Sequence, residues 1–299
     1  MRQLGMVLFV LFVFGSSAWG WWPRGHGILT RAAVQALPAD APAFLRASAG
    51  MVSHAAVDPD VAKNRGTLHL ERAGHPVHYF NMELFEVADL PASRYAFVRL
   101  CAELGKRPEQ VGLLPYATAE YTGQLALSFA EFRKWPESPF IQNKCLIYAG
   151  YVAHFAQEIC QPLNLTIHWN GRVVDGKSSM TRIHEKIDGL LQNLDLEPEA
   201  IAEGLTAAPV DSLMTGIVAQ MHESFGEVES ALSMEQYLIP KDIDWKNKPA
   251  VRAFAEKHAK RAAGFTVSLY LTAWKMSEKI RLPGWIDRGE MDHFGANKK

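Results

Sequence analysis

The sequence predicts an all-α protein, and three observations support that prediction. Apolar residues recur at helical spacing through most of the 299 residues. The helical stretches stop at Pro or Gly, as at Pro38 and Gly105. The one turn of the Asn-Gly type that we identify is Trp169-Asn170-Gly171, which we expect to turn a loop rather than a hairpin. We therefore expect a single multi-helix domain without internal repeats or linkers.

The expected helices follow one another along the chain. Helix 28–37 ends before Pro38, and helix 93–104 ends at Gly105. Helix 116–133 is entered through Leu114-Pro115 and carries apolar residues at roughly helical spacing. A long helix is expected at 140–159, and further helices at 180–194, 210–232 and 249–280.

The helix at 140–159 is apolar and rich in small residues, so we expect it at the centre of the core. It also carries His154 and Glu158. A buried, unpaired carboxylate is costly, so Glu158 requires a cation, a hydrogen-bond network or exposure. A metal ion meets that need, and an Arg or Lys from a neighbouring helix is the alternative.

Two His-x-x-x-carboxylate pairs stand close together in the sequence, His154/Glu158 and His184/Asp188. Residues four apart lie one turn apart on the same face of a helix. Neutral imidazole with carboxylate is a donor set that zinc takes at catalytic sites. One such pair is weak evidence, because surface helices carry similar pairs. Two pairs near further His and Asp candidates favour a metal site.

Overall composition argues against one class of protein. Hydrophobic residues make up 48% of the chain and charged residues 21%, and the formal net charge is −1. A dedicated duplex-DNA binder usually carries a basic field, which is missing from this composition. An enzyme that takes short single strands or phospholipids at a metal centre is still compatible with this charge.

Residues 1–20 have the pattern of a signal peptide. Arg2 is followed by an unbroken apolar run over 6–14, and Ala18-Trp19-Gly20 is a cleavage site of the A-x-A type. We expect cleavage near Gly20, a mature domain of 21–299 without a membrane span, and a periplasmic or secreted location. The three cysteines (Cys101, Cys145 and Cys160) have no metal-ligand spacing, and their pairing stays open.

Several segments between Trp21 and Asp188 resemble one known superfamily. They are Trp-Trp-Pro-Arg-Gly-His (21–26), Asp58-Pro59-Asp60, Val77-His78-Tyr79-Phe80-Asn81, Gly112-Leu113-Leu114-Pro115-Tyr116, and His154 to Gln161-Pro162-Leu163. The chain is similar to the superfamily of zinc-dependent phospholipases C and single-strand-specific nucleases. The last third of the chain matches only as generic helix.

The resemblance implies an all-α domain with zinc ions bound in one cleft by ligands from several helices. It implies one zinc held by Trp21, His26 and Glu158, a second by Asp60, His78, His154 and Glu158, and a third by Asn164, His184 and Asp188. Trp21 would bind through the amine that signal-peptide cleavage frees. Asp60 and Glu158 would hold the reacting centre, and Asp58 is the candidate general base.

The chain departs from the superfamily pattern at two ligand positions. Glu158 replaces an Asp that bridges two zincs, and Asn164 replaces a His. An amide oxygen suits zinc poorly beside imidazole, so the third site would bind zinc weakly, bind another metal or stay empty. His168 would substitute for Asn164 only if helicity continued past 164. His75 lies three residues before His78 and is expected to be a bystander.

The sequence therefore predicts an exported zinc phosphodiesterase with two or three metal ions, in which a metal-activated water attacks phosphorus. A phospholipid substrate of the phospholipase C type is preferred over single-stranded nucleic acid. The alternative from another class is a homologue that keeps a metal as a structural or binding element and has lost catalysis.

Overall fold

The computed structural model describes residues 21–85 and 90–291, and the expected signal peptide at 1–20 lies outside them. The α-helices are α1 Pro23–Gln35, α2 Ala43–Arg46, α3 Ala49–Ala55, α4 Asp58–Val61, α5 Leu68–Gly74, α6 Arg94–Glu103, α7 Pro108–Val111, α8 Leu114–Lys134, α9 Pro139–Ile159, α10 Ile183–Asp188, α11 Leu190–Asn193, α12 Pro198–Ala202, α13 Leu213–Phe225, α14 Val228–Ser233, α15 Glu235–Leu238, α16 Pro249–Ser277 and α17 Arg288–Met291. The short 3-10 helices within the described ranges are η1 His75–His78, η2 Met82–Leu84, η4 Pro162–Leu165 and η5 Trp245–Asn247. The strands within the described residues are β1 Val173–Val174 and β2 Lys177–Ser178, so the all-α prediction is confirmed.

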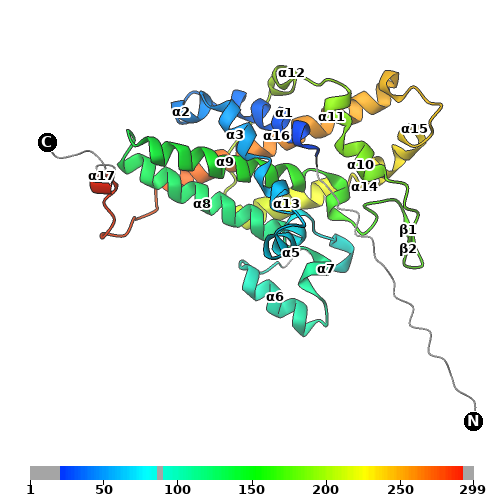
Figure 1. Ribbon diagram of the computed structural model, residues 1–299, viewed down its shortest axis with the longest axis horizontal. Helices are drawn as coiled ribbons and strands as arrows, with labels where there is room; N and C mark the ends of the chain where they lie inside the picture. The colour runs from blue at the N-terminus through cyan, green and yellow to red at the C-terminus, as the bar shows by residue number, and fades with distance from the viewer. Residues whose placement is uncertain (1–20, 86–89, 292–299) are drawn as a thin grey trace, which may run out of the picture.

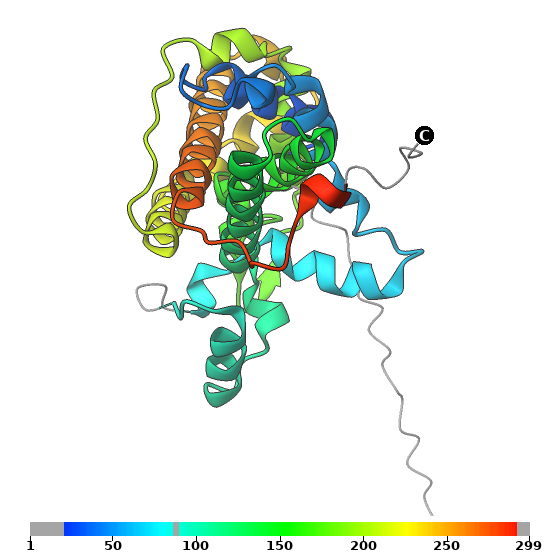
Figure 2. The ribbon, with the colours of Figure 1, turned by 90° about the vertical axis from the view of Figure 1, so that its left-hand side faces the viewer.

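Three long helices, α8, α9 and α16, pack against one another and form the centre of the molecule. Helices α1 and α3 pack on this layer, while α6 and α7 project away from it (Figures 1 and 2). Pro139 and Pro249 stand at the first turns of α9 and α16, where a missing backbone N–H costs no hydrogen bond. Helix α9 therefore lies where its sequence predicted, in the core.

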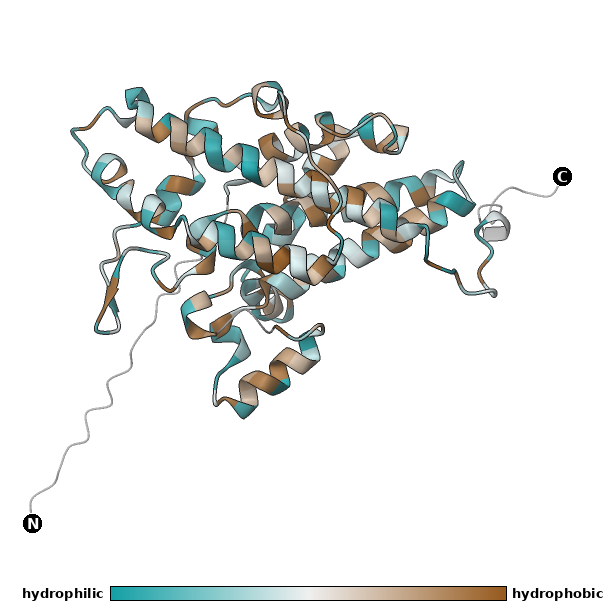
Figure 3. Ribbon diagram, turned by 180° about the vertical axis from the view of Figure 1, so that it is seen from behind, coloured by the Kyte–Doolittle hydropathy of each residue, from teal (hydrophilic) through white to brown (hydrophobic). Residues whose placement is uncertain are grey.

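The long helices are amphipathic rather than uniformly apolar. Polar and apolar bands alternate along them when the ribbon is coloured by hydropathy (Figure 3). Within residues 21–85 and 90–291, none of the helices combines the length and apolarity that crossing a membrane requires. The apolar faces meet in a core whose fully buried members include Phe129, Phe155 and Tyr270.

Several boundaries differ from those the sequence predicted. The helix expected from 180 begins only at Ile183, because Met180 and Arg182 have positive φ angles of 52° and 63°, which a right-handed helix excludes. The helix expected over 210–232 is divided into α13 and α14 near Gly226. The turn at 169–171 forms as expected, with Gly171 N donating to His168 O at 3.0 Å.

The sequence prediction missed the hairpin formed by β1 and β2. Its turn is Asp175-Gly176, with φ angles of 50° and 73°, the left-handed conformation of a tight hairpin turn. The strands are two residues long each, too short to show an alternating pattern. All three cysteines (Cys101, Cys145 and Cys160) are buried as free thiols.

Gly150 sets the distance between α9 and α3. A Cβ atom at this position would lie 2.5 Å from the Ala55 Cβ and 2.7 Å from the Ala55 carbonyl carbon. The absence of a side chain therefore allows the backbone of α9 to approach the end of α3. His154, one turn further along α9, then reaches the Ala56 carbonyl with Nδ1 at 2.9 Å.

Candidate metal centre

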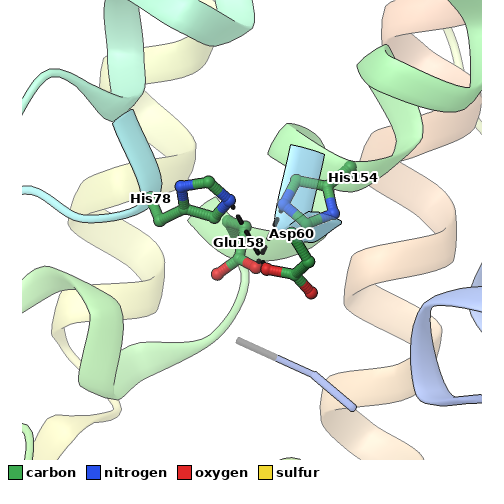
Figure 4. Close-up of side chains that lie close together, drawn as sticks. All are labelled: Asp60, His78, His154 and Glu158. Atoms are coloured by element: carbon green, nitrogen blue, oxygen red, sulfur yellow. Dashed lines mark ion pairs between the residues drawn. The ribbon is translucent and has the colours of Figure 1, made fainter. Parts of the chain in front are cut away.

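Four side chains of metal-ligand type meet inside the protein (Figure 4). Asp60 comes from α4, His78 from the end of η1, and His154 and Glu158 from α9. One ligand atom from each lies within 4.8 Å of the others, and none of the four residues is more than 4% exposed. We call these four residues the central cluster. All four were predicted as ligands from the sequence.

His26 of α1 extends the central cluster. Its Nε2 lies 3.3 Å from Glu158 Oε1 and 3.9 Å from Asp60 Oδ2. Glu158 Oε1 also lies 3.4 Å from His154 Nε2, so one carboxylate oxygen faces two imidazoles. His26 and His154 stack with their ring centroids 4.3 Å apart. A fifth predicted ligand therefore lies where the sequence analysis expected it.

The inward-facing nitrogen and oxygen atoms of these residues face one another across the cluster. Across the described parts of the chain, His26 Nε2, His78 Nε2, His154 Nε2, Glu158 Oε1 and Asp60 Oδ2 are buried without a hydrogen-bond partner. Buried polar atoms are nearly always hydrogen-bonded, so five orphans converging on one point require an explanation. A bound cation is a sufficient one, because imidazole nitrogen and carboxylate oxygen are its preferred donors.

The outer ring nitrogens fix the orientation of all three histidines. Nδ1 of His78 donates to Gly74 O at 2.6 Å, and Nδ1 of His154 donates to Ala56 O at 2.9 Å. A carbonyl accepts only, so each ring carries its proton on Nδ1 and directs the Nε2 lone pair inward. His26 Nδ1 lies 2.7 Å from Gln157 Oε1, which holds this ring with its Nε2 toward Glu158. This arrangement is typical of metal-ligating histidines.

The histidines of the central cluster are neutral at neutral pH. Burial, reinforced by the Lys63 charge, lowers the pKa of His78 to about 3. Burial, together with the neighbouring His26 and His78, holds the pKa of His154 well below its usual value. For His26 burial acts in the same direction, but the carboxyls of Glu158 and Asp60 outweigh it and raise the pKa. The Nε2 lone pairs of His78 and His154 are thus available to a metal without loss of a proton.

Lys63 contributes a fixed positive charge beside the ligands. Its Nζ lies 2.6 Å from Asp60 Oδ1, and its side chain is 3% exposed. Burial on its own would raise the pKa of Asp60, but Lys63, His26 and His78 outweigh it and lower the pKa. Asp60 is therefore held in its ionised form, the form that can bind a cation. The pKa of Glu158, in contrast, is raised by burial.

Trp21 and Gln157 complete the end of the cluster nearest α1. Trp21 is fully buried, and its indole Nε1 donates to the Gln157 carbonyl at 3.3 Å, one residue before Glu158. The Gln157 amide nitrogen donates to Thr30 Oγ1 at 3.0 Å, which holds the amide oxygen toward His26. Trp21 therefore packs against the α9 backbone directly before Glu158, and its predicted coordination through the freed amine stays a prediction.

The segment carrying His78 is held from two directions. Phe80 N donates to Asn164 O at 2.9 Å, and Leu113 N donates to Pro76 O at 2.6 Å. Gly112 makes this approach feasible, because its φ is +109° and a Cβ there would lie 2.0 Å from Tyr79 O. The Gly-Leu-Leu-Pro segment named in the sequence analysis thus positions His78 rather than touching the ligands itself.

His184 and Asp188 form a separate pair on α10. His184 Nε2 lies 3.3 Å from Asp188 Oδ2, and Gln161 Nε2 donates to Asp188 Oδ1 at 2.7 Å. Burial holds the pKa of His184 at about 3 and raises the pKa of Asp188 well above its usual range. Asn164, the expected third member, directs its amide nitrogen at Glu158 instead.

The other sequence candidates lie outside the ligand group. Asp58 is half-buried at the start of α4, and its charge contributes, after burial, to the raised pKa of Tyr151. No α-helix lies between Ile159 and Ile183, so the helix that would direct His168 to the place of Asn164 does not form. His168 Nδ1 instead accepts a hydrogen bond from Val173 N at 2.9 Å. His75 Nε2 lies 4.0 Å from Glu71 Oε1, and His75 lines the same cavity as His78.

Two hollows share His78 as a wall residue. A cavity of 270 Å³ is lined by His75, His78, Tyr79, Asn81, Leu163, Asn164, Thr166, Trp169 and His184. A wider groove of 760 Å³ includes Leu70, Tyr95, Tyr121, Tyr151 and Phe155 in its lining. Both the cavity and the groove therefore extend to His78 of the central cluster and offer space for a bound molecule beside it.

Two functional side chains were missed as such in the sequence. They are Lys63, three residues after Asp60, and Gln157, directly before Glu158. A glutamine on the buried face of a core helix needs a hydrogen-bond partner for its amide. This requirement could have indicated that Gln157 contacts another buried polar side chain. The position of Lys63 against Asp60 depends on the short turns of α4, which left no pattern in the sequence.

Comparison with known proteins adds little to this geometry. The chain matches no family model and no curated protein. Among solved structures it is similar to the alpha toxin of Clostridium absonum, with 11% identity and a TM-score of 0.47 over 88% of this chain and 68% of the toxin. For the alpha-toxin of Clostridium perfringens strain SWCP the identity is 10% and the TM-score 0.43, over 88% of this chain and 65% of the toxin. Similarity this weak carries no conclusion about activity, and we assign the site from its geometry.

Proposed function

We propose that the protein is a metal-dependent phosphodiesterase with zinc at the central cluster. The observation that carries this proposal is the convergence of five orphaned donor atoms from three histidines and two carboxylates. Asp60, His78, His154 and Glu158 would hold one zinc. His26, Glu158 and the amine of Trp21, freed by cleavage after Gly20, would hold a second. The expectation of export rests on the pattern of residues 1–20.

Zinc supplies a water of lowered pKa and an electrophile for a phosphate oxygen. The chain supplies the rest. Backbone carbonyls fix the tautomers of His78 and His154, and Gln157 fixes His26. Lys63 keeps Asp60 ionised. Burial excludes bulk water from the ligands, and the shared wall at His78 lets a phosphate group approach from the surface.

A phospholipid is the substrate class that we place first. The groove beside His78 is lined by Leu70, which is 55% exposed, and it includes the apolar side chains of Val77 and Phe155. Exposed aliphatic groups next to a hydrolytic centre suit the hydrocarbon part of a lipid. Asp58 stays our candidate general base, because its neighbours Pro59 and Tyr151 line the same groove.

Single-stranded nucleic acid is the second candidate, and a specific observation favours it. Tyr95, which is 86% exposed, lies in the same groove as Tyr121 and Tyr151. Unpaired bases stack on exposed aromatic rings regardless of sequence. Arg94 nearby is bound to Glu120, so its charge is already neutralised.

The two substrate classes are separated by assays with and without chelator. We expect hydrolysis of phosphatidylcholine in mixed micelles that chelation abolishes and zinc restores. The substitution Leu70→Ser should slow micelle hydrolysis several-fold and leave a soluble phosphocholine ester unaffected. If nucleic acid is the substrate, Tyr95→Ala should weaken binding of a single-stranded oligonucleotide by about 10-fold. No chelator-sensitive hydrolysis of either substrate would contradict the proposed enzyme.

A further inference from the structure

Asn164 is oriented by two acceptors of the same residue. Its amide nitrogen donates to Glu158 Oε2 and lies 3.2 Å from the Glu158 backbone carbonyl. Exchanging the amide nitrogen and oxygen would place an oxygen against both acceptors, so this orientation is set by the contacts. The nitrogen cannot bind a metal. Only the amide oxygen remains as a donor, and it is the poorer ligand for zinc beside imidazole.

The same contact determines how Glu158 presents its carboxylate. Oε2 is held by Asn164, whereas Oε1 faces His26 Nε2 at 3.3 Å and His154 Nε2 at 3.4 Å. One oxygen is therefore fixed by the protein, and the other is shared between the two imidazoles. Glu158 is fully buried, so no water competes for either oxygen.

We propose that Asn164 is a positioning residue for Glu158, and that the two side chains act as one unit that gives the protein a two-metal centre. The proposal rests on the metal centre proposed above. In it, Asn164 orients the shared carboxylate by its hydrogen bond and contributes no ligand. His184 and Asp188 are left with two donors on one helix, too few for a structural or catalytic zinc site, which takes three or four protein ligands.

The lengths of the two side chains make them dependent on each other. An Asp at 158 would withdraw the carboxylate by about one carbon–carbon bond, ~1.5 Å, out of reach of the Asn164 amide. An imidazole at 164 is larger than the amide and would clash with the Glu158 carboxylate, which is fully buried and has no room to move aside. Either Glu158→Asp or Asn164→His alone removes the hydrogen bond between the two side chains. The two substitutions together make room for an imidazole at 164, because the shorter Asp leaves space for it. That imidazole would lie on the wall of the 270 Å³ cavity, together with His184.

Four proteins test the proposal: the wild type, Glu158→Asp, Asn164→His, and the double variant. Each is produced as the full chain, its first residue is checked by mass spectrometry, and zinc is counted at equilibrium with a defined free zinc concentration. We expect two zinc ions in the wild type and fewer than two in each single variant. The double variant should regain both and bind a third. This recovery distinguishes positioning from a general structural role.

Zinc-free protein provides a second readout that does not depend on the metal. Unfolding by urea of the same four proteins gives a double-mutant cycle, and we expect the two substitutions to be non-additive. A wild type that binds three zincs, or substitutions whose effects on stability and zinc content simply add, would overturn the proposal. A wild type that binds no zinc overturns the proposed function itself. Two zincs with additive substitutions overturn only the role of Asn164.

Discussion

The two His-x-x-x-carboxylate pairs look equivalent in the sequence and are different in the structure. His154/Glu158 lies in the middle of α9 and is joined by side chains from α1, α4 and η1. His184/Asp188 lies on the short helix α10, where Gln161 takes one carboxylate oxygen and Asn164 is directed elsewhere. A pair on one helix face supplies two donors. Whether it becomes a metal site depends on what other elements bring to it.

Removing one imidazole from each region gives the largest contrast. We expect His154→Ala to lower the zinc affinity of the central cluster by at least about 100-fold, since losing an outer-shell partner alone costs 10–100-fold. His184→Ala removes the corresponding residue of the other pair and should change the affinity of the tightly bound zinc by less than about 3-fold. Isothermal titration with zinc measures both. Equal losses in the two variants would mean that the regions form one site.

The close approach of α9 to α3 provides the next test, because it positions His154 in the central cluster and does not involve His184 or Asp188. Gly150→Ala introduces a Cβ 2.5 Å from that of Ala55. Overpacking of this kind costs about 2–3 kcal/mol, and here it would also move His154 away from Ala56 O. We expect a lower midpoint of urea unfolding and a weaker central zinc. Gly123→Ala on α8, where a Cβ meets nothing within 4 Å, is the matched control and should stabilise by up to about 1 kcal/mol through helix propensity alone.

The glutamines behind the two regions provide a matched pair of smaller changes. Gln157 holds His26, and Gln161 holds Asp188. Gln157→Leu should weaken zinc binding by about 10-fold, because the tautomer and ring orientation of His26 are no longer fixed. Gln161→Leu should leave the affinity for the first two zincs unchanged. Similar losses from both substitutions would show that Asp188 serves the central cluster.

Much of the site could be predicted from sequence because its signals are local. His154/Glu158, His184/Asp188 and the spacing from Trp21 to His26 are visible along the chain. The contact between Asn164 and Glu158 was not, because it depends on the end of α9 and the turn into η4. Lys63 was missed for the same reason. Side-chain direction over one or two turns decides these roles, and the residue pattern does not encode it.

In the fold, too, the features with a local sequence signal were predicted and those without one were missed. Helix α9 was located to within one residue, because Pro139 and its long apolar stretch fix its start and burial. Helix α10 was expected to begin three residues too early, because the left-handed residues Met180 and Arg182 carry no glycine signal. The hairpin turn at Asp175-Gly176 had the right residues, but its strands were too short for recognition.

His258 on α16 is a buried histidine outside both regions. Burial, with help from Arg261, lowers its pKa to about 4 from 6.5. The unfolded chain therefore binds a proton below about pH 6.5 that the folded chain refuses until about pH 4. Stability that is fully present above pH 6.5 is lost as the pH falls through this window, at most about 3 kcal/mol.

The substitution His258→Gln should remove this dependence. In zinc-free protein, the difference in unfolding free energy between wild type and variant should shift in favour of the variant between pH 7 and pH 4.5. Urea unfolding at three pH values measures it. The remaining acid sensitivity then includes that of His78, His154 and His184, whose pKa values are lowered by burial, and that of carboxyls with lowered pKa values such as Asp60 and Glu131. Parallel curves for the two proteins would show that His258 does not titrate in this window.

The most direct test of the metal centre is the number of zinc ions bound by the processed chain. Native mass spectrometry counts them on protein whose first residue is confirmed as Trp21. We predict two per chain in the wild type and fewer than two in His154→Ala, which removes a donor of the zinc held with Asp60, His78 and Glu158. A chain that binds no zinc, or one that keeps both ions in the His154→Ala variant, would contradict the assignment of the metal centre to the central cluster.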